Sequence, residues 1–439
     1  METIPCPVAR QHGHERTRHL APVVHPGANF HFMDVASFRA LGSPEGQALL
    51  SEASGLDVSE DGLLAAASRL RERHDPGLVS AALTQVRLRE RARVKFGDDA
   101  DRMYFTQAGL EQSTRASVAS HRARRFASCV PGARVLELGC GIGADLVARA
   151  REGLEGEGVE LDPLTTEVAQ ANVVALGVEG LVSVRVGDAV AERPDGFGAV
   201  FADPGRRTTR GRVFDPRSYE PPLDVVLDSA GRVPAACVKV APGIPHEVVP
   251  DGAEAEWVSV GGDVKEAALW LGALAGDVGR RATLLSSDLH HPQMWTLTPQ
   301  GLDDPDVRPW GRYVYEPDGA VIRARLVAEV AELVGGGLAD PRIAYVTSDA
   351  LRPTPFASAY EIEDVLPFSV KRLRAELRRR GVGVLTVKKR GSAVDVDRLR
   401  RDLGFGGRRA PRGAPELTLV ATRVGRDPVA LLTRPVPRP

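Results

Sequence analysis

A glycine-rich turn constrains the fold of this chain more than any other feature. Residues 135–138 are an apolar run interrupted by the acid Glu137, and Gly139, Gly141 and Gly143 follow at alternate positions before helix-forming residues resume. Glycine permits a tight turn and lets a ligand approach the backbone closely, because it has no Cβ. The pattern predicts the nucleoside-binding end of a doubly wound α/β domain.

The turn is compatible with two kinds of nucleoside. Gly139, Gly141 and Ala144 also match the dinucleotide fingerprint, and Glu160 lies at about the expected distance downstream. Glu137 separates the two, because a carboxylate at this position would repel a pyrophosphate. S-adenosylmethionine (SAM) has no phosphate and carries an ammonium and a sulfonium, which an acid attracts. We therefore expect SAM as the cofactor.

Three further strands are expected downstream, and each ends in an acid. Glu160 is placed to accept both ribose hydroxyls, and Asp188 suits an edge of the adenine. Asp203, followed by Pro204, lies beside the expected position of the reacting methyl group. A single acid after a strand is more often a helix cap or a turn residue. Together with Glu137, the order and spacing of these acids favour a SAM site.

At these residues the chain resembles class I SAM-dependent methyltransferases, over roughly residues 100–290. The resemblance implies a Rossmann-like domain in which Glu137, the three glycines, Glu160 and Asp188 bind the cofactor. In many members a segment before the first strand covers the methionine end of SAM, and Gln107 and Thr114 are the candidates here. The alternative is that this segment packs on the sheet without a ligand contact.

Asp203 and Pro204 resemble the start of the catalytic Asp-Pro-Pro motif of amine methyltransferases. The resemblance implies that the Asp203 carboxylate and the Pro204 carbonyl accept two hydrogens of an exocyclic amine and direct its lone pair at the methyl group. Those enzymes continue with proline and a stacking aromatic, whereas this chain has Gly205, Arg206 and Arg207. The two arginines are expected to hold a phosphate or carboxylate, to stack through their guanidinium groups, or to pair with nearby acids.

The length of the chain, 439 residues, predicts more than one domain. Residues 1–32 lack apolar periodicity and are expected to form a flexible extension. Residues 33–100 read as helical, with cap signals at Ser43-Pro44 and Asp75-Pro76. The methyltransferase domain is expected over residues 101–338. A smaller α+β domain of ferredoxin-like type is expected over residues 339–439.

Composition limits the cellular setting. The chain has no run of 18 apolar residues, so no membrane-spanning helix is expected. Its four cysteines are scattered without metal or disulfide spacing, and the histidines are isolated or near the N-terminus. We therefore expect no metal site and no membrane partner, and a cytoplasmic protein with reduced thiols.

Charge is distributed unevenly. Residues 341–439 contain 21 Lys and Arg against 10 Asp and Glu, whereas the rest of the chain contains 36 against 48. Within the basic part, Lys371 to Arg380 fall on one expected helix, and Lys388, Lys389 and Arg390 end the next expected strand. A charge run is usually a solvated face, but a basic segment joined to an acidic body suggests a module that faces a polyanion.

The arrangement resembles bacterial SAM-dependent methyltransferases with a C-terminal THUMP-like domain. The markers lie in residues 203–207, 365–368 and 387–391. THUMP domains bind RNA, so the resemblance implies an RNA substrate, bound in part by Arg206, Arg207 and the Lys388–Arg390 cluster. Residues 104–107 and the first motif also resemble trimethylguanosine synthases, which implies a guanine exocyclic amine as the target. A methyltransferase for a small molecule or a protein, and a non-catalytic SAM- or RNA-binding protein, are the alternatives.

Overall fold

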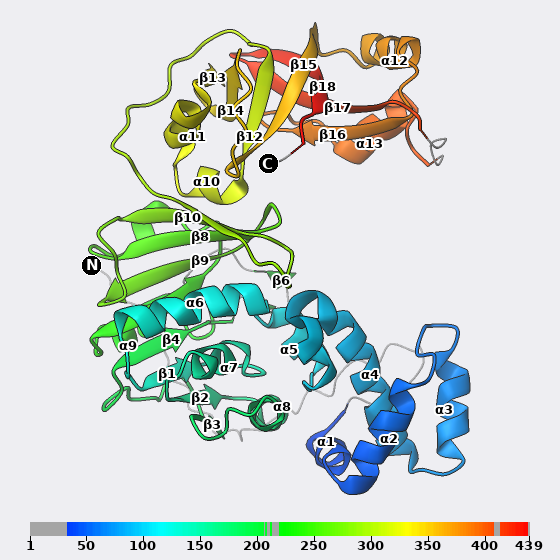
Figure 1. The fold of residues 1–439 in the computed structure, drawn as a ribbon, viewed down its shortest axis with the longest axis vertical. Helices are drawn as coiled ribbons and strands as arrows, with labels where there is room; N and C mark the ends of the chain where they lie inside the picture. The colour runs from blue at the N-terminus through cyan, green and yellow to red at the C-terminus, as the bar shows by residue number, and fades with distance from the viewer. Residues whose placement is uncertain (1–32, 206, 209–210, 213–218, 408–412, 438–439) are drawn as a thin grey trace, which may run out of the picture.

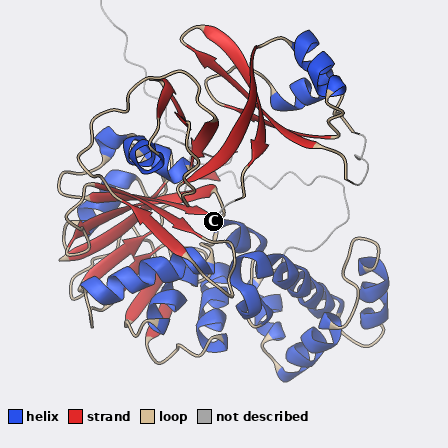
Figure 2. Ribbon diagram, turned by 45° about the horizontal axis from the view of Figure 1, so that its top comes forward, coloured by secondary structure: helices blue, strands red, loops and turns tan. Residues whose placement is uncertain are grey.

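A computed structural model describes residues 33–205, 207–208, 211–212, 219–407 and 413–437. An N-terminal helical region and two large β-sheets with helices against them make up most of the molecule (Figures 1 and 2). The expected flexible extension, residues 1–32, lies outside the described residues.

The described part of the chain begins with a helical region, in which two helices begin where the sequence shows cap signals. The Ser43 side chain accepts a hydrogen bond from the Gly46 N–H at 3.0 Å, and Asp75 accepts from Gly77 and Leu78. Each cap is followed by proline at the first helical position, where its missing N–H costs nothing. The helices of this region are α1 (Val35–Leu41), α2 (Pro44–Ser54), α3 (Leu63–Arg71) and α4 (Pro76–Phe96).

The N-terminal helices are packed firmly on the domain that follows. Their apolar side chains form one continuous cluster with those of α7 (Ala144–Arg151), α8 (Pro163–Ala175) and β3 (Val182–Val186). Asn172 of α8 accepts a hydrogen bond from the Tyr104 N–H at 2.7 Å and donates to the Tyr104 carbonyl at 3.0 Å. These contacts fix the segment that joins the helical region to the first sheet.

The first sheet has nine strands in the order β11-β10-β8-β9-β7-β4-β1-β2-β3. The five from β3 to β7 are mutually parallel, and β9 runs antiparallel between β7 and β8. The strands not yet given are β1 (Val135–Leu138), β2 (Gly156–Glu160), β4 (Ala199–Ala202), β7 (Ala235–Val240), β8 (Glu254–Val260), β9 (Asp263–Gly272), β10 (Arg280–Leu285) and β11 (Met294–Leu297).

The parallel half of this sheet contains a topological switch point. From β1 the chain proceeds outward to β2 and β3, then returns to the other side of β1 with β4 and β7. In open α/β sheets, ligands bind beyond the carboxyl ends of the strands at such a point. The Rossmann-like class I architecture predicted from the sequence is confirmed by this order.

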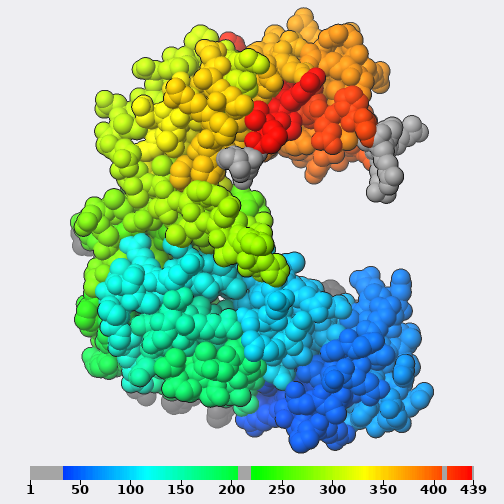
Figure 3. Space-filling view, in the orientation of Figure 1, coloured from blue at the N-terminus to red at the C-terminus, as the bar shows by residue number. Residues whose placement is uncertain are grey.

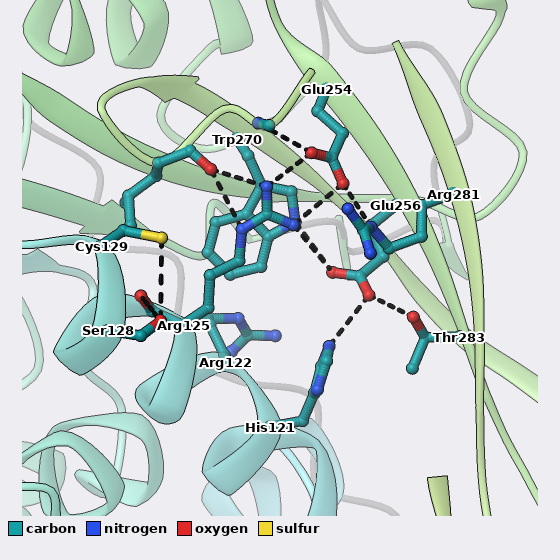
Figure 4. A network of polar contacts seen from close by, with 12 residues as sticks. His121, Arg122, Arg125, Ser128, Cys129, Glu254, Glu256, Trp270, Arg281 and Thr283 are labelled. Carbon is teal, nitrogen blue, oxygen red and sulfur yellow. Dashed lines mark hydrogen bonds and ion pairs between the residues drawn. The ribbon is translucent and has the colours of Figure 1, made fainter. Parts of the chain in front are cut away.

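Helix α6 (Ala116–Cys129) covers one face of the sheet and is held there by a buried polar network (Figure 4). Arg125 donates to both oxygens of Glu254, at 2.9 and 2.6 Å, and its guanidinium lies 4.3 Å from the Trp270 ring. Glu256 is fully buried and pairs with His121 at 2.9 Å. Burial would raise the pKa of Glu256, but His121, Thr283 and Arg125 outweigh it and lower that pKa to about 2.

The second sheet has seven strands in the order β13-β14-β12-β15-β18-β17-β16. Only β16 and β17 are parallel neighbours, which makes this unit α+β, as expected from the sequence. The strands are β12 (Tyr313–Pro317), β13 (Gly337–Asp340), β14 (Ile343–Ser348), β15 (Ala357–Pro367), β16 (Val384–Lys389), β17 (Glu416–Val424) and β18 (Asp427–Pro435).

This unit begins before residue 338, where the sequence predicts a domain boundary. Residues 313–317 form β12, which pairs with both β14 and β15. Helices α10 (Gly319–Arg323) and α11 (Val327–Val334) follow it and are separated at Arg325, whose φ is 55°. Strands on both sides of residue 338 therefore share one sheet, although the sequence suggested a boundary there.

Helices α10 and α11 lie between the two sheets, and a single apolar cluster runs from β1 and β4 through them to β12 and β14. Helices α12 (Val370–Arg379) and α13 (Val396–Leu403) cover the other end of the second sheet. Figure 3 shows that the segment carrying α12 and α13 borders a hollow whose opposite wall is formed by the N-terminal helices. Helix α5 (Gln107–Gln112) and β6 (Gly211–Arg212) lie on the same side of the molecule (Figure 1).

Candidate active site

The glycine-rich turn after β1 has the geometry that its sequence predicts. Gly139, Gly141 and Gly143 have φ values of 75°, 55° and 83°, in the left-handed region that favours glycine. A Cβ at Gly141 would meet no other atom within 4 Å, so the turn leaves open space there. The Gly141 N–H donates to the Glu160 carboxylate at 2.9 Å, which ties the turn to the end of β2.

A cavity of about 730 Å³ opens at the carboxyl ends of β1, β2 and β4. The predicted cofactor residues that border it are Thr114, Glu137, Gly139, Gly141, Glu160 and Asp188, together with the predicted catalytic Asp203. Gly143 instead caps α7, and Gln107 binds Arg91 and Glu111. Pro204 is buried between Asp203 and Gly205, both of which border the cavity.

Two of the acids predicted to bind the cofactor organise loops at the cavity rim. Glu160 accepts from the Gly141 and Asp162 N–H groups, at 2.9 and 3.1 Å. Asp188 is exposed and accepts from the Val190 N–H at 2.9 Å. Both are therefore held in fixed positions, where their remaining lone pairs can accept from hydroxyl or amino groups of a nucleoside.

Glu137 borders the cavity but is not a free acid. Its carboxylate is buried and forms an ion pair with Arg149 of α7, which lies in turn over the rings of Phe126 and Phe201. Burial raises the pKa of Glu137 to about 7, although the neighbouring Arg149 acts to lower it. The Glu137 carboxylate is therefore already engaged by the Arg149 guanidinium, which weakens its attraction for the ammonium group of a cofactor.

Directly beneath the lining of the cavity, in a region that we call its floor, lies a residue that the sequence did not single out. Lys239 lies in the buried strand β7, and its ammonium donates to Asp203 Oδ2 at 2.5 Å and to Thr114 Oγ1 at 3.0 Å. Only 4% of Lys239 is exposed. Lysine is almost never fully buried unless it is paired, so a lysine in the apolar run 235–240 is a signal that the sequence does contain.

A second ion-paired group lies beside Lys239. Arg122 of α6 is buried and pairs with Asp145 of α7 and Glu266 of β9, and Glu266 lies 3.9 Å from the Lys239 ammonium. Neighbouring Arg122 and Lys239 lower the pKa of Asp145, although its burial acts to raise it. Counted as formal charges, the five groups Arg122, Lys239, Asp145, Asp203 and Glu266 carry a net charge of −1, which suits a cationic ligand.

Helix α5 forms one wall of the cavity and is pressed against the glycine-rich turn. A Cβ at Gly109 would lie 2.4 Å from Cγ2 of Ile142, so only glycine allows this approach. Lys95 of α4 donates to the carbonyls of Leu110 and Ser113 at the end of α5, at 2.6 and 2.9 Å. The helical region thus supports a wall of the cofactor cavity directly.

The loop after Asp203 returns to the cavity at Glu220. Gly205 and Glu220 exchange two backbone hydrogen bonds, at 2.7 and 2.9 Å, and Glu220, Pro221 and Pro222 border the cavity. Of the two arginines predicted to bind substrate, Arg206 lies outside the described residues. Arg207 begins the short strand β5 (Arg207–Thr208), for which the backbone alone is described.

The predicted cluster at the end of β16 is engaged within its own unit. Lys388 donates to Glu316 of β12 at 2.5 Å, and Lys389 donates to the Val394 carbonyl at 2.7 Å. Arg390 lies 4.0 Å from the same Glu316 carboxylate and over the Tyr345 ring. The structure does not bring these three residues to the cofactor cavity.

The described residues contain neither a membrane-spanning helix nor a cluster of metal ligands. No helix there is both long and apolar enough to cross a bilayer. No group of three or more histidine, cysteine, aspartate or glutamate side chains there could hold a metal ion.

The cavity fits SAM by its own features. The space beside Gly141 is open, the carboxylates of Glu160 and Asp188 are fixed at the rim, and the floor carries a net negative charge. A ligand with a ribose, an amine and a cationic sulfur suits each of these features in turn.

Comparisons with known proteins agree with this geometry. The chain is 36% identical over 376 residues to an uncharacterised S-adenosylmethionine-dependent methyltransferase of Mycobacterium tuberculosis, matched in two strains, with 83% of this chain and 97% of the relative covered. The fold matches the crystal structure of a "putative methyltransferase" from Porphyromonas gingivalis W83. That match has a TM-score of 0.69 and 21% identity, and it covers 89% of this chain and 98% of the other. Family models match a domain of unknown function (DUF8688) over residues 34–92 and a THUMP domain-like family over residues 357–435.

Proposed function

The chain belongs to the family of S-adenosylmethionine-dependent methyltransferases, and from this premise we propose that it methylates RNA, at an exocyclic amine of a base such as guanine. The observation that carries the proposal is the position of Asp203. Asp203 directly follows β4 and borders the cavity, where Lys239 donates a hydrogen bond to its carboxylate. A carboxylate in that place can accept hydrogen from an amine that approaches the cavity.

SAM supplies an activated methyl group on a sulfonium, so the protein's main task is to position the acceptor. Lys239 binds Oδ2 of Asp203, whereas Oδ1 has no hydrogen bond to a described residue. In the proposed complex, Oδ1 and the Pro204 carbonyl accept the two amine hydrogens, which directs the nitrogen lone pair at the methyl carbon. The base must be unpaired or flipped out of a helix to reach this position.

The C-terminal unit supports RNA as the substrate. The family match over residues 357–435 is to THUMP-like domains, which resemble RNA-binding THUMP domains. Residues 341–439 carry 21 basic against 10 acidic residues, so a polyanion is attracted to this part of the chain.

The test is transfer of a labelled methyl group from SAM to bulk RNA, with DNA and protein extracts in parallel. We expect label in RNA, and Asp203→Ala should reduce it by roughly 100- to 1,000-fold, as the loss of one positioned group at a reacting centre does. Asp263→Ala is a matched control, because its side chain is 82% exposed at the start of β9. SAM binding, measured by calorimetry, should be nearly the same in all three proteins.

Two results would contradict the proposal. Label in protein or DNA but not in RNA would remove RNA as the substrate. Wild-type turnover in Asp203→Ala would remove the role of Asp203 while leaving the methyltransferase assignment intact.

A further inference from the structure

The outer surface of α12 and α13 is strongly basic. Residues 370–379 and 396–403, which form these helices, together contain 8 Lys and Arg against 3 Asp and Glu. By contrast, residues 34–100, which form the opposite wall of the hollow in Figure 3, contain 9 against 11. The excess of positive charge therefore lies on one wall.

Packing of the two helices turns their basic residues outward. Leu373 and Leu377 of α12 and Leu399 and Leu403 of α13 are buried on the second sheet, where they form an apolar cluster with its leucines. Lysine and arginine occupy eight of the fourteen other positions of the two helices. Arg374 of α12 donates to the Asp402 carbonyl of α13, so the two helices form one continuous surface.

Five of these basic side chains are exposed and have no hydrogen bond or ion pair to any described residue. They are Lys371, Arg372 and Arg378 of α12 and Arg400 and Arg401 of α13. Lys371 and Arg378 are seven residues, or about 10 Å, apart along α12, on the same side of the helix. Unlike Lys388, which is paired with Glu316, these groups can displace counterions from a nucleic-acid backbone without breaking an internal contact.

We propose that these five residues, the α12–α13 basic face, form an RNA-binding surface that grips the phosphate backbone. The inference rests on the proposed function and adds the surface that holds the substrate. The aromatic residues beside the two helices, Phe368 and Phe405, pack against the leucine cluster. The face thus offers charge rather than a stacking platform, which suits contacts that hold RNA without reading its sequence.

An extended row of positive groups favours a continuous polyanion over a folded acidic protein, whose charges are interspersed with other residues. The segment that carries α13 also borders the hollow, on the side of the molecule where α5 and β6 lie (Figures 1 and 3). RNA bound there has a route along the hollow towards the cofactor cavity.

The test compares two double variants of the full-length protein. Arg400→Gln/Arg401→Gln removes two charges from the face. Arg69→Gln/Arg71→Gln removes two exposed arginines of α3 that also lack an ion pair to a described residue. The probe is a fluorescein-labelled single-stranded RNA of 20 nucleotides and mixed sequence, titrated by anisotropy at several salt concentrations, with polyglutamate of similar length in parallel.

We expect Arg400→Gln/Arg401→Gln to weaken RNA binding about tenfold at low salt and to reduce the slope of log K against log salt by roughly 1.4, since each phosphate contact on a single strand contributes about 0.7. The α3 variant should change neither quantity. Equal losses in both variants, or an unchanged slope in the first, would overturn the proposal. Polyglutamate binding as tight as RNA binding, and equally sensitive to the first variant, would also overturn it.

The outcome is separable from that of the proposed function. Methyl transfer to RNA with binding unaffected by the substitutions would leave the function and remove this surface. Binding that depends on Arg400 and Arg401, without methyl transfer to RNA, would leave the surface and remove the function.

Discussion

The cavity floor and the α12–α13 basic face use the same residue types in opposite ways. At the floor, Arg122 and Lys239 are buried and each contacts two or more polar groups. On the basic face, Arg400 and Arg401 are exposed and have no ion pair to a described residue. A buried ion pair fixes geometry and resists salt, whereas an exposed charge is mobile, is screened by salt and is free to bind a ligand.

The difference suggests that the two groups of charges have separate roles. The interior charges hold the Asp203 carboxylate, for which we propose a role in orienting the acceptor, and they are part of the folded core. The exterior charges contribute little to stability and can be used entirely for binding. Substitutions in the two regions should therefore affect different measurements.

The largest expected effect is on stability. Arg122→Met removes the partner of two buried carboxylates, Asp145 and Glu266, and should lower the free energy of unfolding by about 3–5 kcal/mol. Arg124→Met, an exposed residue on the same helix, should change it by less than about 0.5 kcal/mol. Urea unfolding followed by tryptophan fluorescence measures both, since Trp257 and Trp270 lie in the same sheet. Similar losses in the two variants would contradict the distinction between paired and exposed charges.

A second effect depends on pH. The pKa of Glu256 is about 2 in the folded protein against 4.5 for the free side chain, so its ionised form stabilises the fold above pH 4.5. That contribution, about 3 kcal/mol, is lost as the pH falls from 4.5 through 2. Glu256→Gln should therefore be less stable than wild type at neutral pH, and the deficit should shrink over this range. Asp263→Asn, at an exposed position, should show no such change, and a constant deficit in Glu256→Gln would refute the role of this ion pair.

Strands β1 to β4 could be predicted from the sequence, because each is followed by the glycine-rich turn or by an acid at or just beyond its end. Glu160, Asp188 and Asp203 lie at or just beyond the ends of β2, β3 and β4, as expected. These signals are local: an apolar run followed by an acid is visible without knowledge of the fold.

The charge pairing could not be predicted, because it depends on distant segments. Arg149 pairs with Glu137 only once α7 packs beside β1, and Lys388 pairs with Glu316 only once β12 joins the second sheet. The sequence shows a basic cluster at residues 388–390 but not the acid that faces it. For the same reason, the sequence placed β12 before the boundary predicted at residue 338, although it belongs to the second sheet.

The smallest expected effect sharpens the comparison within the C-terminal unit. Lys388→Gln removes a charge that is paired with Glu316 and lies over the Tyr360 ring. It should lower the free energy of unfolding by less than about 1 kcal/mol, because the pair is partly exposed. It should change RNA affinity by less than about twofold. A loss of RNA affinity as large as that in Arg400→Gln/Arg401→Gln would show that the paired cluster also contacts RNA.

The most direct test of these separate roles uses two variants, Asp203→Ala and Arg400→Gln/Arg401→Gln. For each preparation, RNA affinity is measured together with the rate of methyl transfer at saturating RNA. The account predicts that Asp203→Ala binds RNA like wild type but transfers almost no methyl group. It predicts that Arg400→Gln/Arg401→Gln binds RNA more weakly but reaches the wild-type rate at saturation. A fall in the saturated rate of the arginine variant, or weakened RNA binding in Asp203→Ala, would contradict it.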